Sequence, residues 1–165
     1  MSRHTRSRTL RRGQFLTAAA AVGLFGLAIR GSAAEAQYEV THTEAQWRAM
    51  LGDDRFEILR RGGTEAAFSS PLIGEKRPGR YECAGCELAI FSSKKKYDSG
   101  DGWPSFWDVL PNTTRTQVDY ALAEMRTEVH CRQCGSHLGH IFDDGPPPTH
   151  LRYCIDGLAL RFVPA

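Results

Sequence analysis

The sequence predicts a mainly β domain of the β-rich α+β class, on three observations. The chain has 165 residues, of which 41% are hydrophobic and 24% charged, a composition typical of a globular domain and unlike disordered, collagen-like or coiled-coil chains. Beyond Tyr81, short runs of β-prone residues are separated by clusters of Gly, Pro, Asn and Asp. Apolar residues at helical spacing occur before that point. The pattern gives no support to a parallel α/β architecture.

Residues 1–36 carry the positive charge of the chain. They hold six arginines and one acid, whereas residues 37–165 hold 15 Lys+Arg and 18 Asp+Glu, a net charge of −3. The net charge of +2 for the whole chain therefore comes from this leader, and nucleic acid is not an expected partner of the domain.

The leader has the form of an export signal. An Arg-rich start is followed by an uncharged apolar stretch over residues 15–29 and by the tail 34–36, which fits an A-x-A cleavage site. The 15 apolar residues fall short of the roughly 20 that cross a bilayer, so no stable membrane anchor is expected. The pair Arg11-Arg12 resembles a twin-arginine signal, which implies the twin-arginine export machinery, while the general secretory route stays open. We expect a periplasmic or otherwise exported protein.

The domain is predicted to begin with two short helices. Thr43 and Gln46 have the spacing of a capping box, and Trp47, Met50 and Leu51 follow at helical spacing. A second helix is expected at about residues 53–61, before two glycines. Later runs are predicted as mainly antiparallel strands, over residues 88–91, 118–122, 125–129 and 158–163.

Four of the five cysteines form two C-x-x-C pairs, Cys83 with Cys86 and Cys131 with Cys134. Four thiolates are the ligand set of a closed tetrahedral zinc site, so the sequence predicts one structural zinc per chain. The 44 residues between the pairs mean that zinc would clip two distant hairpins together. Two disulfides or a redox-active C-x-x-C are the alternatives in an exported protein. We favour zinc because redox C-x-x-C motifs normally occur singly and at a helix start.

The fifth cysteine, Cys154, is a candidate nucleophile. A lone thiol is often a small buried apolar residue. Arg152, however, lies two residues before it, a spacing that places both side chains on one face of a strand. A nearby cation lowers the pKa of a thiol and raises the thiolate fraction.

Three further segments, SGDGWPSF at 99–106, HLGHIFDDGP at 137–146 and RYC at 152–154, occur in order with the paired cysteines. Together they make the chain from about residue 43 to 162 resemble the B-type methionine sulfoxide reductases. The resemblance implies two antiparallel sheets with flanking N-terminal helices and a zinc held by the four paired cysteines. It also implies that Cys154 is the nucleophile and that the R epimer of methionine sulfoxide is reduced, more readily in proteins or peptides than as the free amino acid.

Sulfoxide reduction needs a soft nucleophile to attack sulfur and a general acid to protonate the oxygen. Cys154 can supply the thiolate, and His137 and His140 are candidates for the acid. Three residues apart, the histidines are expected to share a helical face or a turn; purely structural histidines or stray zinc ligands are the alternative. Trp103, between a glycine and a proline, offers an indole face for the S-methyl group, unless it is a core residue.

The chain departs from the family pattern at two positions. Many relatives carry a recycling cysteine where this chain has Asp101, so a sulfenic acid on Cys154 is expected to be reduced by an external, thioredoxin-like thiol. Relatives usually have asparagine where this chain has Asp156, whose charge would raise the pKa of a neighbouring thiol. We expect Asp156 to be protonated or paired with Arg152, or the enzyme to be slower or altered in substrate. Arg152 has a further possible partner in Asp143 or Asp144.

The predicted function is an exported, monomeric reductase of methionine-R-sulfoxide. A general thiol–disulfide oxidoreductase is one alternative, and it would need a reactive C-x-x-C pair. A non-catalytic, zinc-ribbon-like binding module is the other, and the aspartate at position 156 favours it.

Overall fold

A computed structural model describes residues 1, 38–122 and 125–165 of the chain. The expected arginine pair, apolar stretch and cleavage site of the leader lie outside the described residues. The described elements follow in this order: α1 Glu44–Arg61, η1 Pro71–Ile73, β1 Gly79–Cys83, β2 Ala89–Ser92, η2 Ser93–Lys95, β3 Lys96–Tyr97, β4 Ser105–Phe106, β5 Thr114–Asp119, β6 Arg126–Cys131, β7 His137–Phe142, β8 Arg152–Ile155, η3 Gly157–Ala159 and β9 Leu160–Pro164. No helix in this described part is long and apolar enough to cross a membrane.

The start of α1 has the predicted capping box. The backbone N–H of Gln46 donates to Oγ1 of Thr43 at 3.3 Å, and the backbone N–H of Thr43 donates to Oε1 of Gln46 at 2.9 Å. The two predicted helices form one segment, in which Gly52 interrupts the helical backbone. Gly62 ends the segment in the left-handed conformation that glycine adopts without strain. Trp47 is buried in the core.

Three of the four predicted strands are confirmed. The runs at 88–91, 125–129 and 158–163 overlap β2, β6 and β9, with ends that differ by no more than two residues. The strand predicted over 118–122 is wrong beyond residue 119, because β5 ends at Asp119. There Oδ1 of Asp119 accepts the backbone N–H of Ala121 at 2.8 Å, so the aspartate starts a turn.

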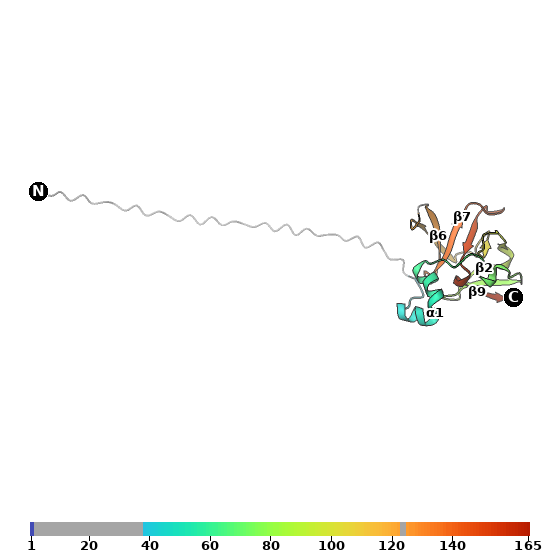
Figure 1. Cartoon of the computed structure of the whole chain (residues 1–165), viewed down its shortest axis with the longest axis horizontal. Helices are drawn as coiled ribbons and strands as arrows, with labels where there is room; N and C mark the ends of the chain where they lie inside the picture. Colours follow the sequence, from blue (N-terminus) through green and yellow to red (C-terminus); the bar gives the residue numbers. More distant parts are fainter. Residues whose placement is uncertain (2–37, 123–124) are drawn as a thin grey trace. The chain divides into compact units, whose positions relative to one another are not determined.

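The strands pair into two antiparallel sheets, which confirms the predicted mainly β class. One sheet has three strands in the order β2-β1-β9, and the other has six in the order β3-β4-β8-β7-β6-β5. Figure 1 shows β6 and β7 side by side in the larger sheet, with α1 near one end of β7. The order places β4 beside β8 although about 50 residues separate them in sequence. Side chains from distant parts of the chain therefore lie next to those of β8.

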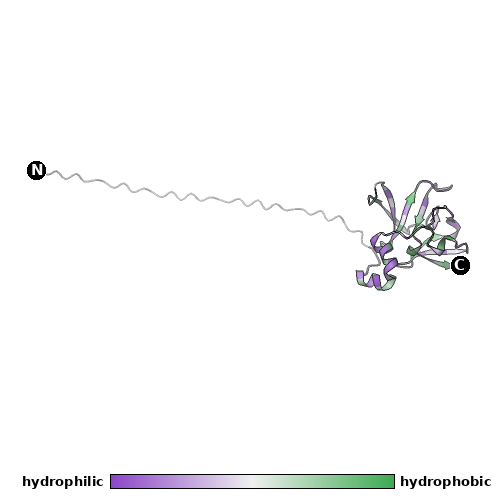
Figure 2. Cartoon of the chain, viewed as in Figure 1, coloured by the Kyte–Doolittle hydropathy of each residue, from purple (hydrophilic) through white to green (hydrophobic). Residues whose placement is uncertain are grey.

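The core lies between the two sheets. Phe91 of β2 stacks on Phe106 of β4 with ring centroids 4.2 Å apart, and Tyr81 of β1 meets Phe106 edge-on at 4.9 Å. All three are fully buried. Figure 2 shows hydrophobic residues gathered in the strands, whereas α1 is mostly hydrophilic. The sheets are thus held by aromatic packing, which fixes the strands that carry the site.

Candidate active site and metal centre

The four paired cysteines meet at one point between the sheets. Cys83 ends β1 in the smaller sheet and Cys131 ends β6 in the larger one, and a turn brings the second cysteine of each pair back. The Sγ atoms of all four lie within 4.8 Å of one another, with 3.7 Å between Cys83 and Cys134 and 3.4 Å between Cys86 and Cys131. Zn–S bonds of about 2.3 Å in a tetrahedron place sulfurs about 3.8 Å apart, so the cluster fits zinc.

The two alternatives for these cysteines do not fit the structure. All five cysteines are free thiols, so no disulfide links the pairs. Each C-x-x-C pair lies on a turn after a strand, whereas redox-active pairs begin a helix that lowers the thiol pKa.

Cys154 lies on β8, in the middle of the larger sheet. It pairs in register with Ser105 of β4 on one side and with His140 of β7 on the other. Arg152 and Cys154 alternate with the buried Tyr153 and Ile155, so the first two share a face of the strand as predicted. Burial raises the pKa of Cys154 to about 11 in the free protein, with Arg152 opposing that shift and Asp101 and Asp156 adding to it. The Arg152 guanidinium therefore lowers the thiol pKa as predicted, but burial raises that pKa by more.

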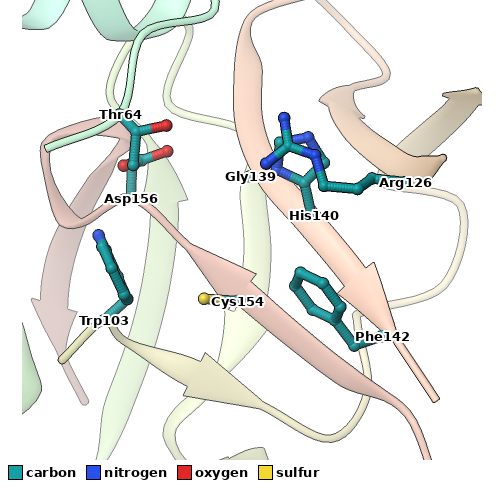
Figure 3. Close-up of a pocket in the computed structure, with 8 residues that line it drawn as sticks. All are labelled: Thr64, Trp103, Arg126, Gly139, His140, Phe142, Cys154 and Asp156. Atoms are coloured by element: carbon teal, nitrogen blue, oxygen red, sulfur yellow. The ribbon is translucent and has the colours of Figure 1, made fainter. Parts of the chain in front are cut away.

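A small pocket opens beside the Cys154 sulfur. It has a volume of about 140 Å³ and is lined by residues from β6, β7, β8 and three loops: Thr64, Trp103, Arg126, Gly139, His140, Phe142, Cys154 and Asp156. Figure 3 shows the sulfur between the rings of Trp103 and Phe142, with the carboxyl group of Asp156 above it. Two aromatic walls and a polar end suit a thioether-like group that carries one polar oxygen.

Trp103 belongs to this pocket and is not a core residue. Its indole Nε1 donates to the backbone carbonyl of Glu65 at 3.2 Å, which fixes the ring plane. Gly102, directly before it, has φ of +90°, and a Cβ there would lie within 3 Å of Ala67 and Phe68. The turn that presents the indole therefore needs a glycine.

His137 and His140 lie on strand β7, and the expected helical face or turn is wrong. Residues three apart on a regular strand face opposite sides. Here β7 carries one extra residue, because His137 pairs with His130 while Gly139 pairs with Val129, so Leu138 has no partner of its own. This bulge returns both histidines to one face, with ring centroids 5.5 Å apart.

His140 is held as a neutral imidazole. Its Nε2 donates to Oδ2 of Asp119 at 2.8 Å, and Arg126 donates to the same oxygen at 2.6 Å. Hydrogen bonds from the Ala121 backbone, His140 and Arg126 hold the pKa of Asp119 at about 2, so this carboxylate only accepts. Burial lowers the pKa of His140, which leaves its Nδ1 as an unprotonated acceptor at neutral pH.

His137 is held as a charged imidazolium. Its Nδ1 lies 2.5 Å from Oε1 of Glu128, and its Nε2 lies 3.5 Å from Oδ2 of Asp156. Burial lowers the pKa of His137, but the two carboxylates outweigh burial and raise it to about 9. The two histidines are therefore poised in opposite protonation states, the arrangement that acid–base pairs adopt.

Arg152 pairs with Asp144, one of the two predicted loop partners, and not with Asp156. Its Nε and Nη2 donate to the two carboxylate oxygens of Asp144 at 2.7 Å each, and its Nη1 pairs with Asp101. The guanidinium also lies over the Phe142 ring at 4.4 Å. Arg152 thus fixes the loop after β7. Asp101 serves as the second ion-pair partner of Arg152.

Asp156 is buried beside the pocket and faces His137. Its Oδ1 accepts the backbone N–H of Glu65 at 3.0 Å, and its Oδ2 is the oxygen near His137. The expected pairing with Arg152 is wrong because Asp156 follows β8 at the end opposite the Asp144 loop. The negative charge is balanced by an imidazolium instead.

Three polar residues of the site escaped the sequence reasoning: Asp119, Arg126 and Glu128. All three come from the β5–β6 hairpin: Asp119 and Glu128 contact the histidines of β7, and Arg126 donates to Asp119. A strand pattern indicates which residues share a face, but it does not tell which neighbouring strand they meet. The register of β6 against β7, including the bulge, decides these contacts.

One thiol in a pocket with a neutral imidazole, and an imidazolium next to the Asp156 carboxylate, is an arrangement typical of an enzyme that uses a cysteine; the other four thiols of the chain are gathered at the metal centre. Comparison with known sequences agrees with this class. The SelR domain profile matches residues 51–164. The chain belongs to the MsrB family of peptide methionine sulfoxide reductases, which confirms the resemblance in its sequence.

Relatives in this family cover most of the domain. "Peptide methionine sulfoxide reductase MsrB" of Herminiimonas arsenicoxydans is 46% identical over 125 residues, 75% of this chain and 91% of the relative. The protein of the same name from Thiobacillus denitrificans is 49% identical over 123 residues, 74% of this chain and 93% of the relative. The one from Methanosarcina mazei is 44% identical over 129 residues, 78% and 92% of the two chains.

Proposed function

We propose that this protein is an exported reductase that converts methionine-R-sulfoxide in oxidised proteins and peptides to methionine. The observation that carries the proposal is the pocket in which Cys154 lies between Trp103 and Phe142, with acid–base side chains at its polar end. Membership of the MsrB family supports the substrate class.

The first step transfers oxygen from substrate to Cys154. The Cys154 sulfur attacks the sulfoxide sulfur and takes its oxygen, so the thiol becomes a sulfenic acid and the substrate leaves as a thioether. His140 is paired directly with Cys154 on the neighbouring strand, and its Nδ1 is an acceptor. It takes the thiol proton. His137 stores a proton behind Asp156 and protonates the sulfoxide oxygen by way of that carboxylate or a water.

The second step needs an external reductant. The pocket holds one cysteine, and the remaining four thiols meet at the metal centre. Two external thiol groups therefore reduce the sulfenic acid to the thiol, with release of water and formation of a disulfide on the reductant. A thioredoxin-like dithiol is the reductant that we propose.

The zinc that fits the four cysteines would be structural. It would be held by Cys83, Cys86, Cys131 and Cys134, which leave no ligand position open for substrate. It would supply folding stability, and the reaction would proceed on the chain's own residues.

Export rests on the leader sequence. Its arginine pair, apolar stretch and A-x-A tail support a periplasmic or otherwise exported location, reached through the twin-arginine machinery. Zinc would then load in the reducing cytoplasm before the thiols meet an oxidising compartment. We also propose that the mature protein is a monomer.

Turnover of the two separated epimers of methionine sulfoxide tests the proposed reaction. With dithiothreitol as reductant, we expect activity on the R epimer and none on the S epimer. Cys154→Ser should abolish turnover while zinc content and thermal stability stay unchanged. Activity on the S epimer alone, or turnover that survives in Cys154→Ser, would show that the proposal is wrong.

A further inference from the structure

Glu65, which lies in the loop after α1, uses its backbone and its side chain to hold two parts of the pocket. Its backbone carbonyl accepts the indole N–H of Trp103 at 3.2 Å, and its backbone N–H donates to Asp156 at 3.0 Å. Its carboxylate accepts the backbone N–H groups of Gly157 at 2.5 Å and Leu158 at 3.0 Å. One residue therefore joins the aromatic wall of the pocket to the segment that follows the nucleophile.

This joint is buried and closely packed. Glu65 is only 8% exposed, although glutamate is among the residues least often buried. Burial raises the pKa of Glu65 against the pull of its two backbone donors, so its burial is costly and must be offset by what the residue holds. A Cβ at Gly157 would overlap the side-chain oxygen of Ser70 and lie 3.0 Å from Oε1 of Glu65. Ser70, and behind it the Glu65 carboxylate, thus leave no room for a side chain at position 157.

We propose that Glu65 is a positioning residue that sets the distance between the Trp103 wall and the Asp156 end of the pocket. It does not line the pocket and acts through these two residues. Its carboxylate anchors the loop to the backbone at 157 and 158, and the anchored loop presents the carbonyl to the indole and the N–H to Asp156. The proposal rests on the proposed function, because it concerns how that pocket binds the sulfoxide.

The first test compares variants of the zinc-loaded protein in steady-state turnover of methionine-R-sulfoxide with dithiothreitol. Glu65→Ala is expected to raise KM about 10-fold, because a displaced binding wall weakens productive alignment. Glu65→Gln keeps one acceptor oxygen and should rescue part of this loss. The matched control is Glu82→Ala, since Glu82 is equally buried but pairs with Arg80 and Arg161 on the smaller sheet.

The second test asks whether the effect passes through the indole. In a Trp103→Phe background, which lacks the indole N–H, Glu65→Ala should change KM by a smaller factor than in the wild-type background, because only the Asp156 end of the pocket then still responds. Strictly additive effects, or a KM in Glu65→Ala and Glu65→Gln no different from that in Glu82→Ala, would overturn the proposal. If Glu65→Ala does not fold, the same comparison is made with Glu65→Gln alone. Failure of the proposed function is distinguishable, because the wild-type protein and Glu82→Ala would then also lack activity on the R epimer.

Discussion

At the scale of single residues, the charge at position 156 gives this site its character. Asp156 and Glu128 lie on opposite sides of His137 and keep it protonated, while burial keeps His140 in the neutral form although the hydrogen bond to Asp119 raises its pKa. The same Asp156 charge contributes to the raised pKa of Cys154. Asp156 thus raises the pKa of His137 and also that of the Cys154 thiol.

Replacing Asp156 by Asn should separate these two effects. The substitution removes a charge beside the thiol and one of the two carboxylates on His137, so the pKa of both Cys154 and His137 should fall. We expect faster turnover at neutral pH and an alkylation profile of Cys154 with iodoacetamide that is shifted to lower pH. Glu82→Gln, on β1 of the smaller sheet and outside the pocket lining, serves as the control. Identical pH–rate and alkylation profiles for Asp156→Asn and the wild type would contradict this account.

The raised pKa of His137 also makes folding stability depend on pH. A group whose pKa is about 9 when folded and about 6.5 when unfolded stabilises the fold below pH 6.5, and this contribution is lost as the pH rises through 9. The loss is on the order of 3 kcal/mol, since each pKa unit is worth about 1.4 kcal/mol. Urea unfolding of the zinc-loaded protein between pH 6 and 10 measures it. His137→Gln should flatten this pH dependence, and an unchanged slope would show that another group is responsible.

At the scale of elements, the β7 bulge creates the site. The unpartnered Leu138 turns His137 and His140 onto one face, and Gly139 beside it has φ of +147°. A Cβ at Gly139 would overlap the carbonyl oxygen of Cys154 on β8. The close approach of β7 to β8 at Cys154 therefore requires glycine at position 139.

Gly139→Ala should force β7 and β8 apart. We expect a loss of unfolding free energy of about 1–3 kcal/mol from overpacking, and a loss of turnover larger than that destabilisation explains. Urea unfolding and steady-state kinetics at a temperature where the variant is fully folded separate the two. Gly100→Ala, at a positive-φ glycine with open space around it, is the control for backbone strain alone. Wild-type kinetics in folded Gly139→Ala would contradict the role of the close approach.

At the scale of the whole molecule, the four-cysteine centre joins the two sheets. Cys83 and Cys86 belong to the β1 end of the smaller sheet, and Cys131 and Cys134 belong to the β6–β7 turn of the larger one. The same β6–β7 pair carries Glu128 and both histidines, so a metal at this point would stabilise the strand register on which the active site depends.

Removing one ligand should therefore affect both folding and catalysis. In Cys131→Ser we expect loss of bound zinc, a fall in melting temperature of more than 10 °C, and loss of turnover as a consequence. Metal analysis, thermal unfolding and the R-epimer assay measure the three effects. Cys154→Ser is the matched control, with zinc and stability retained and turnover lost. Full zinc content in Cys131→Ser would contradict the four-ligand centre.

The order and spacing of residues along the chain were enough to predict the mainly β class, the capped N-terminal helix, the four-plus-one division of the cysteines and the family. These features are local in sequence, or depend on residue types whose chemistry is the same in any fold. The position of the β7 bulge, the pairing of Arg152 with Asp144, and the carboxylates around the histidines were decided only by tertiary structure. The physical reason is that each contact joins strands far apart in sequence, and their register is set by packing of the two sheets and not by any local pattern.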